Sequence, residues 1–125
     1  MPLVDLANKP FDYSAFPATK TILFFWSKNL SSHFIAAHKK ALALQKKFPE
    51  YKFIAVNLDS DVSEWQSTIA KYNFKGIVEL QAKDFEETKR KWAIMKVHRT
   101  LILEPNWEIK NAFTNLFDAD FEKQL

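Results

Sequence analysis

The 125-residue sequence contains no cysteine and a single glycine, Gly76. The absence of cysteine excludes disulfides, thiolate metal sites and a dithiol redox cycle run by this chain alone. One glycine cannot form a glycine-rich phosphate-binding loop. No apolar run approaches the roughly 20 residues that a membrane-spanning helix requires, and the first residues lack the basic start and apolar middle of a signal peptide. We therefore expect no membrane span, in a chain that is either cytoplasmic or the mature or excised part of an exported protein.

What the sequence does contain is apolar and aromatic. Hydrophobic residues make up 47% of the chain and aromatic residues 15%, which is typical of a folded protein with a substantial core. The length predicts a single domain over residues 1–125. The net charge of +3 comes from lysines spread along the predicted helices. Nucleic-acid binding requires a concentrated basic patch, so we expect no nucleic-acid partner.

The chain is organised around a predicted strand, Thr21–Trp26, followed by a helix from Ser31 or Ser32 to Phe48. An unbroken apolar run of this kind is typical of a strand covered on both faces in a parallel sheet. The helix has one apolar stripe, formed by Phe34, Ala37, Ala41, Leu44 and Phe48. Its N-terminus, with free N–H groups, should lie at the carboxyl edge of the sheet, where we expect the functional site.

The remaining elements predict an α/β fold. A strand over residues 51–58 should lie parallel to the first, because strand–helix–strand crossovers are right-handed. Asp61 and Glu64 form a capping box for a helix Val62–Tyr72, which we favour over a metal or acid/base pair made by Asp59 and Asp61. The other expected elements are a loose hairpin or edge strand within residues 3–16, a strand at 76–81, a helix from Asp84, an antiparallel hairpin of strands 99–104 and 107–113, and a last helix from Asp118 or Asp120.

Two stretches resemble a known family. The run from Phe25-Trp26-Ser27 to Ser31-Ser32-His33 is similar to the thioredoxin-like family, specifically its TlpA/ResA branch of thiol–disulfide oxidoreductases, which typically read Phe-Trp-Ala-Ser-Trp-Cys-x-x-Cys there. In that alignment Leu30 and His33 stand at the two cysteine positions. Residues 94–104 resemble the branch's Val-Pro-Thr-x-Phe-Leu-Ile-Asp pattern, with His98 in place of its cis-proline. A cis bond before a non-proline residue costs about 2.5–4 kcal/mol, so we expect this peptide to be trans.

The resemblance covers nearly the whole chain in element order. It implies a thioredoxin-like three-layer α/β sandwich, with a central mixed β-sheet flanked by helices. Residues 1–19 would form an N-terminal β-hairpin extension, and residues 20–125 the thioredoxin core. It also implies a groove at the former active site. The expected lining residues of this inherited groove are Trp26, Asn29, Leu30, Ser31, Ser32, His33, Val97, His98 and Arg99.

Within this groove we expect no catalytic residue, no cofactor and no metal. A serine near His33 and His98 suggests a nucleophile with its base, but a serine at this position is typical of a helix cap, and no acidic residue is placed to orient either histidine. His33 and His38 lie about 140° apart around the helix and cannot chelate together. The helix N-terminus, with its serines, His33 and Arg99, could instead hold an anion or a peptide carboxylate. An exposed Trp26 or Leu30 would give a partner an apolar contact.

The sequence therefore predicts a redox-inactive member of the TlpA/ResA-like group that binds a protein or peptide partner. Two enzymatic alternatives stay open: an oxidoreductase whose cysteines lie in another domain or subunit, and a glutathione-handling protein that uses a helix-capping serine. The resemblance implies a bacterial protein, periplasmic or tethered to the outer side of a membrane, while a cytoplasmic location also stays open. The partner and the oligomeric state are not specified by the sequence.

Overall fold

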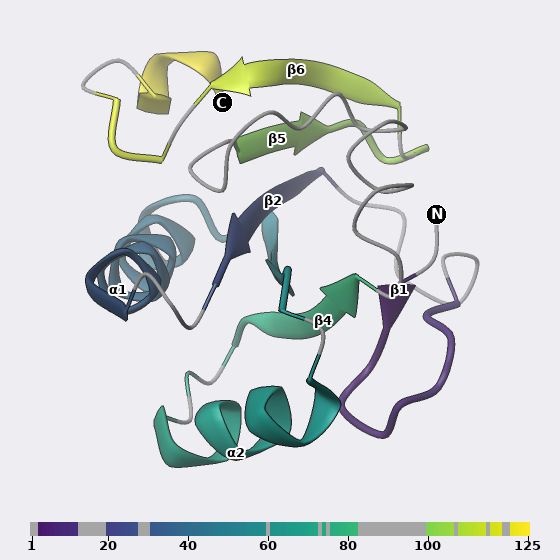
Figure 1. Ribbon diagram of the computed structural model, residues 1–125. Coiled ribbons are helices and arrows are strands. Elements are labelled where there is room, and N and C mark those ends of the chain that lie inside the picture. Colours follow the sequence, from purple (N-terminus) through teal and green to yellow (C-terminus); the bar gives the residue numbers. More distant parts are fainter. Residues whose placement is uncertain are drawn as a thin grey trace.

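In the computed structural model, the described part of the chain forms one six-stranded sheet with helices packed against it (Figure 1). Its elements are β1 (Leu3–Val4), β2 (Thr21–Trp26), α1 (Ser31–Lys47), β3 (Lys52–Asn57), α2 (Val62–Tyr72), β4 (Val78–Ala82), β5 (Thr100–Leu103), β6 (Ile109–Thr114) and the 3₁₀ turn η1 (Phe121–Gln124). The structure describes residues 3–12, 20–27, 31–59, 61–72, 74, 76–82, 100–106, 108–114, 116–118 and 121–125.

The sheet is mixed, as predicted, and in the described part of the chain its strand order is β1-β4-β3-β2-β5-β6. β2 and β3 are parallel, and so are β3 and β4. β5 runs antiparallel to β2 and forms an antiparallel hairpin with β6. The crossover through α1 therefore joins parallel strands, and the final hairpin is antiparallel, as the sequence indicated. Because β2, β3 and β4 share one direction, their carboxyl ends meet at one edge of the sheet.

β2 is buried along its whole length, which confirms the prediction made from its apolar run. Alternate side chains enter two different core clusters. Ile22, Phe24 and Trp26 lie in the cluster that also contains the buried side chains of α1 and α2. Leu23 and Phe25 lie in the second cluster, on the opposite face of the sheet. This alternation follows from the two-residue period of a strand and gives both faces of β2 apolar contacts.

α1 packs through the stripe that the sequence predicted. Its side chains Phe34, Ala37, Ala41 and Leu44 are all at most 2% exposed. The helix ends at Lys47, one residue before the predicted end, and the N–H of Phe48 still donates to the carbonyl of Leu44 at 2.7 Å. Figure 1 shows α1 lying beside β2, and α2 beside β4.

α2 has the predicted bounds and the predicted cap. The Oδ1 atom of Asp61 accepts a hydrogen bond of 2.9 Å from the N–H of Glu64, so Asp61 is the N-cap residue. Trp65 and Ile69 are buried on this helix and enter the same core cluster as α1. The capping interpretation of Asp61 is thereby confirmed.

The N-terminal segment adds a short edge strand. β1 pairs antiparallel with β4, placing Leu3 opposite Ala82. The chain then turns at Asn8, whose φ is 61°, and the N–H of Phe11 donates to the carbonyl of Leu3 at 2.8 Å. The expected hairpin or edge strand is therefore present over residues 3–12.

Two predicted elements differ from the structure. β4 begins at Val78, two residues later than predicted, because the chain turns at Gly76, whose φ is +92°. The expected last helix is a 3₁₀ turn of four residues, which buries Phe121 against the α1 side of the sheet. The helix predicted from Asp84 lies outside the described residues, as does the peptide bond before His98. No helix among the residues that the structure describes has the length and apolar character needed to cross a membrane.

Candidate functional site

The candidate site lies where the parallel strands end and α1 begins. β2 ends at Trp26 and α1 starts at Ser31, so the first turn of α1 stands at the carboxyl edge of the sheet. Of the nine predicted groove residues, Trp26, Ser32 and His33 are fully described, and Ser31 is described as the first residue of α1. Asn29, Leu30, Val97, His98 and Arg99 lie outside the described residues. Their approach to α1 stays a prediction.

Trp26 is buried, so the expectation that its side chain is exposed is wrong. Its relative exposure is 0%, and its ring stacks on Phe34 with centroids 4.2 Å apart. The cause is the alternation along β2: Trp26 points to the same face as Ile22 and Phe24, and α1 covers that face. The indole therefore packs between the sheet and the first turns of α1, against Phe34 and His38. It offers no apolar surface to a partner.

The first turn of α1 is accessible beyond this buried ring. Ser32 is exposed and His33 is half-buried. The His33 ring packs edge-on against Phe117, with centroids 5.9 Å apart. Phe117 is 46% exposed and follows β6 in the chain. It gives this edge an exposed aromatic side chain that the sequence interpretation missed, because an isolated phenylalanine after a strand carries no periodic signal.

A polar network fixes the neighbouring loop at the ends of β2 and β3. The Ser27 hydroxyl donates to Oδ1 of Asp59 at 2.7 Å, and the amide of Asn57 donates to Oδ2 of the same carboxylate at 2.9 Å. The Asp59 N–H in turn donates to Oδ1 of Asn57 at 3.0 Å. Both carboxylate oxygens of Asp59 thus accept hydrogen bonds from protein groups, which gives this residue a structural role.

Gln81 extends the network to β4. Its buried amide nitrogen donates to Oδ1 of Asn57 at 3.0 Å and to the carbonyl of Asp59 at 2.8 Å. A buried polar group must find hydrogen-bond partners, and Gln81 finds them in the last residue of β3 and in the loop that follows it. The carboxyl edge of the sheet is therefore a preorganised frame, which we call the edge network: Ser27, Asn57, Asp59 and Gln81.

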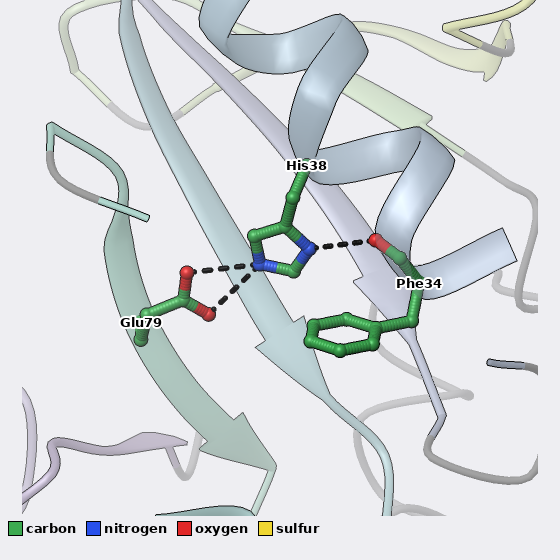
Figure 2. A network of polar contacts seen from close by, with 3 residues as sticks. All are labelled: Phe34, His38 and Glu79. Carbon is green, nitrogen blue, oxygen red and sulfur yellow. Dashed lines mark hydrogen bonds and ion pairs between the residues drawn. The ribbon is translucent and has the colours of Figure 1, made fainter. Parts of the chain in front are cut away.

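A second polar pair lies deeper, beneath α1, and the sequence interpretation did not anticipate it. His38 projects from α1 and is 0% exposed, and Glu79 projects from β4 and is 7% exposed. Nε2 of His38 lies 2.9 Å from Oε2 and 3.2 Å from Oε1 of Glu79. Nδ1 of His38 lies 2.9 Å from the carbonyl oxygen of Phe34. Figure 2 shows the imidazole between the carboxyl group of Glu79 and the carbonyl oxygen of Phe34.

The geometry determines how many protons the pair holds. The carbonyl of Phe34 can only accept, so Nδ1 of His38 carries a hydrogen. The contact between Nε2 and the carboxyl group then needs one further proton, held either by the imidazole or by Glu79. In both arrangements the pair has no net charge. Burial raises the pKa of Glu79, while the hydrogen bond and the charge of His38 oppose that rise.

The sheet register creates the space for this pair. Phe24, Ala55 and Glu79 stand opposite one another on β2, β3 and β4. The imidazole of His38 contacts both outer members of this row, since its centroid is 5.3 Å from that of Phe24. The small side chain between them leaves room for the ring. The sequence held a signal for this placement, because His38 falls within the apolar stripe of α1, four residues after Phe34 and three before Ala41.

The described residues contain no group of three or more His, Cys, Asp or Glu side chains arranged to hold a metal ion. The pair of His38 and Glu79 has only two such groups and is closed to solvent. The described part of the site therefore consists of an accessible helix start, an exposed aromatic ring and a rigid polar frame.

Comparison with known proteins gives the family. A family model described as thioredoxin-like matches residues 19–109. No curated protein sequence matches the chain. Among solved structures, a candidate thiol–disulfide oxidoreductase from Bacteroides vulgatus superposes with a TM-score of 0.81 at 18% identity, covering 98% of this chain and 87% of that one.

Two further solved structures have the same fold. A thiol–disulfide oxidoreductase from Bacteroides fragilis has a TM-score of 0.77 at 19% identity, covering 100% of this chain and 96% of that one. An exposed lipoprotein thioredoxin from Streptococcus pneumoniae has a TM-score of 0.78 at 12% identity, covering 99% and 95%. At these identities the likeness shows the shared fold.

Proposed function

Because the chain belongs to the thioredoxin-like family and yet contains no cysteine, we propose that it is a redox-inactive member that binds a protein or peptide partner. The binding surface would be the inherited groove at the start of α1. Two of the solved structures with this fold are named as thiol–disulfide oxidoreductases, one of them as a candidate. Their chemistry requires a thiolate, which no residue of this sequence supplies.

The single observation that carries the proposal is the retention of this edge of the fold without its sulfur atoms. The edge network still ties the ends of β2, β3 and β4 together through hydrogen bonds of 2.7–3.0 Å. A rigid frame lowers the entropy that binding would otherwise cost. At the same edge of the sheet, Ser32 is exposed and His33 is half-buried in the first turn of α1.

The chemistry of the described residues favours a peptide that combines an acceptor or carboxylate with an apolar side chain. The positive end of the α1 helix dipole, at the first turn of the helix, would face the carboxylate or carbonyl oxygens. Phe117, 46% exposed beside His33, would contact the apolar side chain. Asn29, Leu30, Val97, His98 and Arg99 would complete the groove, as the family resemblance implies.

The resemblance also supports a more specific placement. We infer a TlpA/ResA-like protein of bacterial origin that works in the periplasm or tethered to the outer side of a membrane. One structure of the same fold is an exposed lipoprotein. A secretory or lipoprotein leader on the full-length gene product would agree with this placement. A full-length product that stays in the cytoplasmic fraction would contradict it.

The test of the binding function is a peptide selection followed by chemical-shift mapping. A phage-displayed random peptide library is selected on the whole chain, and an enriched peptide is titrated into isotopically labelled protein. We expect shift changes at residues 29–33, at residues 97–99 and at Phe117. A peptide that leaves all of these residues unmoved, or a library that yields no enriched peptide, would contradict the proposal.

A matched pair of variants sharpens the test. Phe117→Ser and Leu6→Ser each remove one exposed apolar side chain, 46% and 42% exposed. We expect the first to weaken peptide binding at least fivefold and the second to leave it unchanged. Insulin reduction and a glutathione titration test the enzymatic alternatives. Turnover of insulin, or saturable binding of glutathione, would replace the binding function with one of them.

A further inference from the structure

We propose that His38 and Glu79 form a proton-operated latch, which holds α1 and the ring of Phe74 against the sheet only while the pair carries one shared proton. The latch joins three parts of the fold. His38 lies on α1, Glu79 lies on β4, and Phe74 lies between α2 and β4. The inference concerns the conformation of the chain and is independent of what the groove binds.

Phe74 covers the pair. Its ring stacks on the imidazole of His38 with centroids 4.5 Å apart and an interplanar angle of 23°. Gly76, two residues after Phe74, is tied to α1, because the amide of Gln45 donates to the carbonyl of Gly76 at 2.8 Å. Phe74 is only partly buried, so outward movement of this one ring would admit water to the pair. The covering ring and the pair are thus in direct contact.

The surroundings of the pair hold no compensating charge among the described contacts. His38 meets the rings of Phe24 and Trp26 from β2, Phe34 from α1 and Phe74 from the segment after α2. Glu79 supplies the one carboxylate among these contacts. The nearby Tyr72 stacks on Phe74 with centroids 6.0 Å apart and lies under the ammonium group of Lys71 at the surface. Within the described part of the chain, a net charge on the pair would therefore have no opposite protein charge in contact with it.

The pH range of the closed state follows from proton counting. With Phe74 moved aside, the hydrated imidazole and carboxyl groups would titrate near their ordinary values of about 6.5 and 4.3. Above about pH 6.5 the open state holds no proton and the closed state holds one, so opening releases a proton. Below about pH 4.3 the open state holds two protons, so opening takes one up. The latch is thus most firmly closed between these limits.

The variant Glu79→Gln changes this profile in a specific way. The glutamine amide can still donate to Nε2 of His38, so the hydrogen bond is kept while the shared proton is lost. The closed variant holds no proton on the pair, and its open state takes one up on the imidazole below about pH 6.5. In this variant the stability of the closed state should therefore no longer fall as pH rises above about 6.5. Its fall toward acid pH should begin roughly two pH units higher than in the wild type.

Hydrogen exchange of backbone amides in α1 and β4 is the test, measured from about pH 3 to 9 and corrected for the intrinsic rate at each pH. We expect wild-type protection to fall about tenfold per pH unit above pH 6.5 and below pH 4.3. Glu79→Gln should show constant protection above pH 6.5. The control Glu122→Gln alters an exposed carboxylate paired with Lys47 and should behave as the wild type.

If Glu79→Gln does not fold, the dependence of wild-type amide protection on pH is enough to test the latch. Protection in α1 that stays constant from pH 6.5 to 9 would overturn the proposal. So would the same profile in the wild type and in a folded Glu79→Gln variant.

Discussion

The buried pair should behave as one unit in a double-mutant cycle of His38→Leu and Glu79→Leu. The His38 side chain is fully buried and that of Glu79 is 4% exposed, so neither has water as an alternative partner. Either single variant leaves the other polar group without its partner, which we expect to lower the free energy of unfolding by about 3–5 kcal/mol. A domain has only about 5–15 kcal/mol in total, so each single variant should lose a large share of the stability of the fold.

The double variant should be far more stable than the sum of the single losses suggests. It leaves no orphaned charge, and leucine fills part of the volume of both side chains. We expect it to lose no more than about 2 kcal/mol, so the coupling free energy should be at least about 4 kcal/mol. Only the hydrogen bond from Nδ1 to the carbonyl of Phe34 is lost without replacement. That loss costs about 1 kcal/mol.

Urea unfolding followed by tryptophan fluorescence measures all four members of the cycle at pH 6. The surface pair of Lys47 and Glu122, 2.6 Å apart with side chains 61% and 38% exposed, provides the control cycle. Its coupling should be about 0.2–1 kcal/mol, because water screens exposed charges. Additive losses in the buried cycle, or equal coupling in the two cycles, would refute the reasoning that the partners depend on each other.

Three further predictions concern stability. The raised pKa of Glu79 means that the folded state keeps its proton at a pH where the unfolded state has lost it. The stability from Glu79 is therefore present below about pH 4.3 and is lost as pH rises through the raised folded pKa. Between about pH 4.3 and the raised pKa, the free energy of unfolding of the wild type should fall relative to that of Glu79→Gln by up to about 1.4 kcal/mol per pH unit. Urea unfolding of both proteins measures this difference. Gly76→Ala should destabilise by about 1–3 kcal/mol, because φ is +92° and a Cβ atom would lie 2.8 Å from Oε1 of Gln45; an unchanged melting temperature would contradict this. Asp61→Ala should cost about 1 kcal/mol through loss of the α2 cap, whereas Asp61→Asn should recover most of it.

The sequence predicted those parts of the fold that depend on local pattern. The apolar run of β2 predicted burial on both faces, and every residue from Thr21 to Trp26 is buried. Asp61 and Glu64 predicted both the start of α2 and its capping hydrogen bond. These features depend on residues close together in the chain, so spacing and residue type contain the necessary information.

The features that the sequence did not predict depend on long-range register. His38 and Glu79 are 41 residues apart, and only the alignment of β2, β3 and β4 brings them together. Trp26 is the last residue of β2, and its burial depends on Phe34 in the first turn of α1 covering the end of the strand, which the apolar run of β2 does not specify. Phe117 reaches His33 through the path of the chain after β6. The remaining groove residues lie outside the described part of the chain, so their placement stays a prediction.

The small residue at the centre of the row Phe24, Ala55 and Glu79 has an evolutionary consequence. Side-chain volume at position 55 limits what α1 can place above it, because the imidazole of His38 contacts both neighbours of Ala55 in the row. A homologue with valine or leucine there would have no space for a ring, and its helix should carry a smaller residue where His38 stands. Covariation between these two positions would therefore mark which members of the family retain the buried pair.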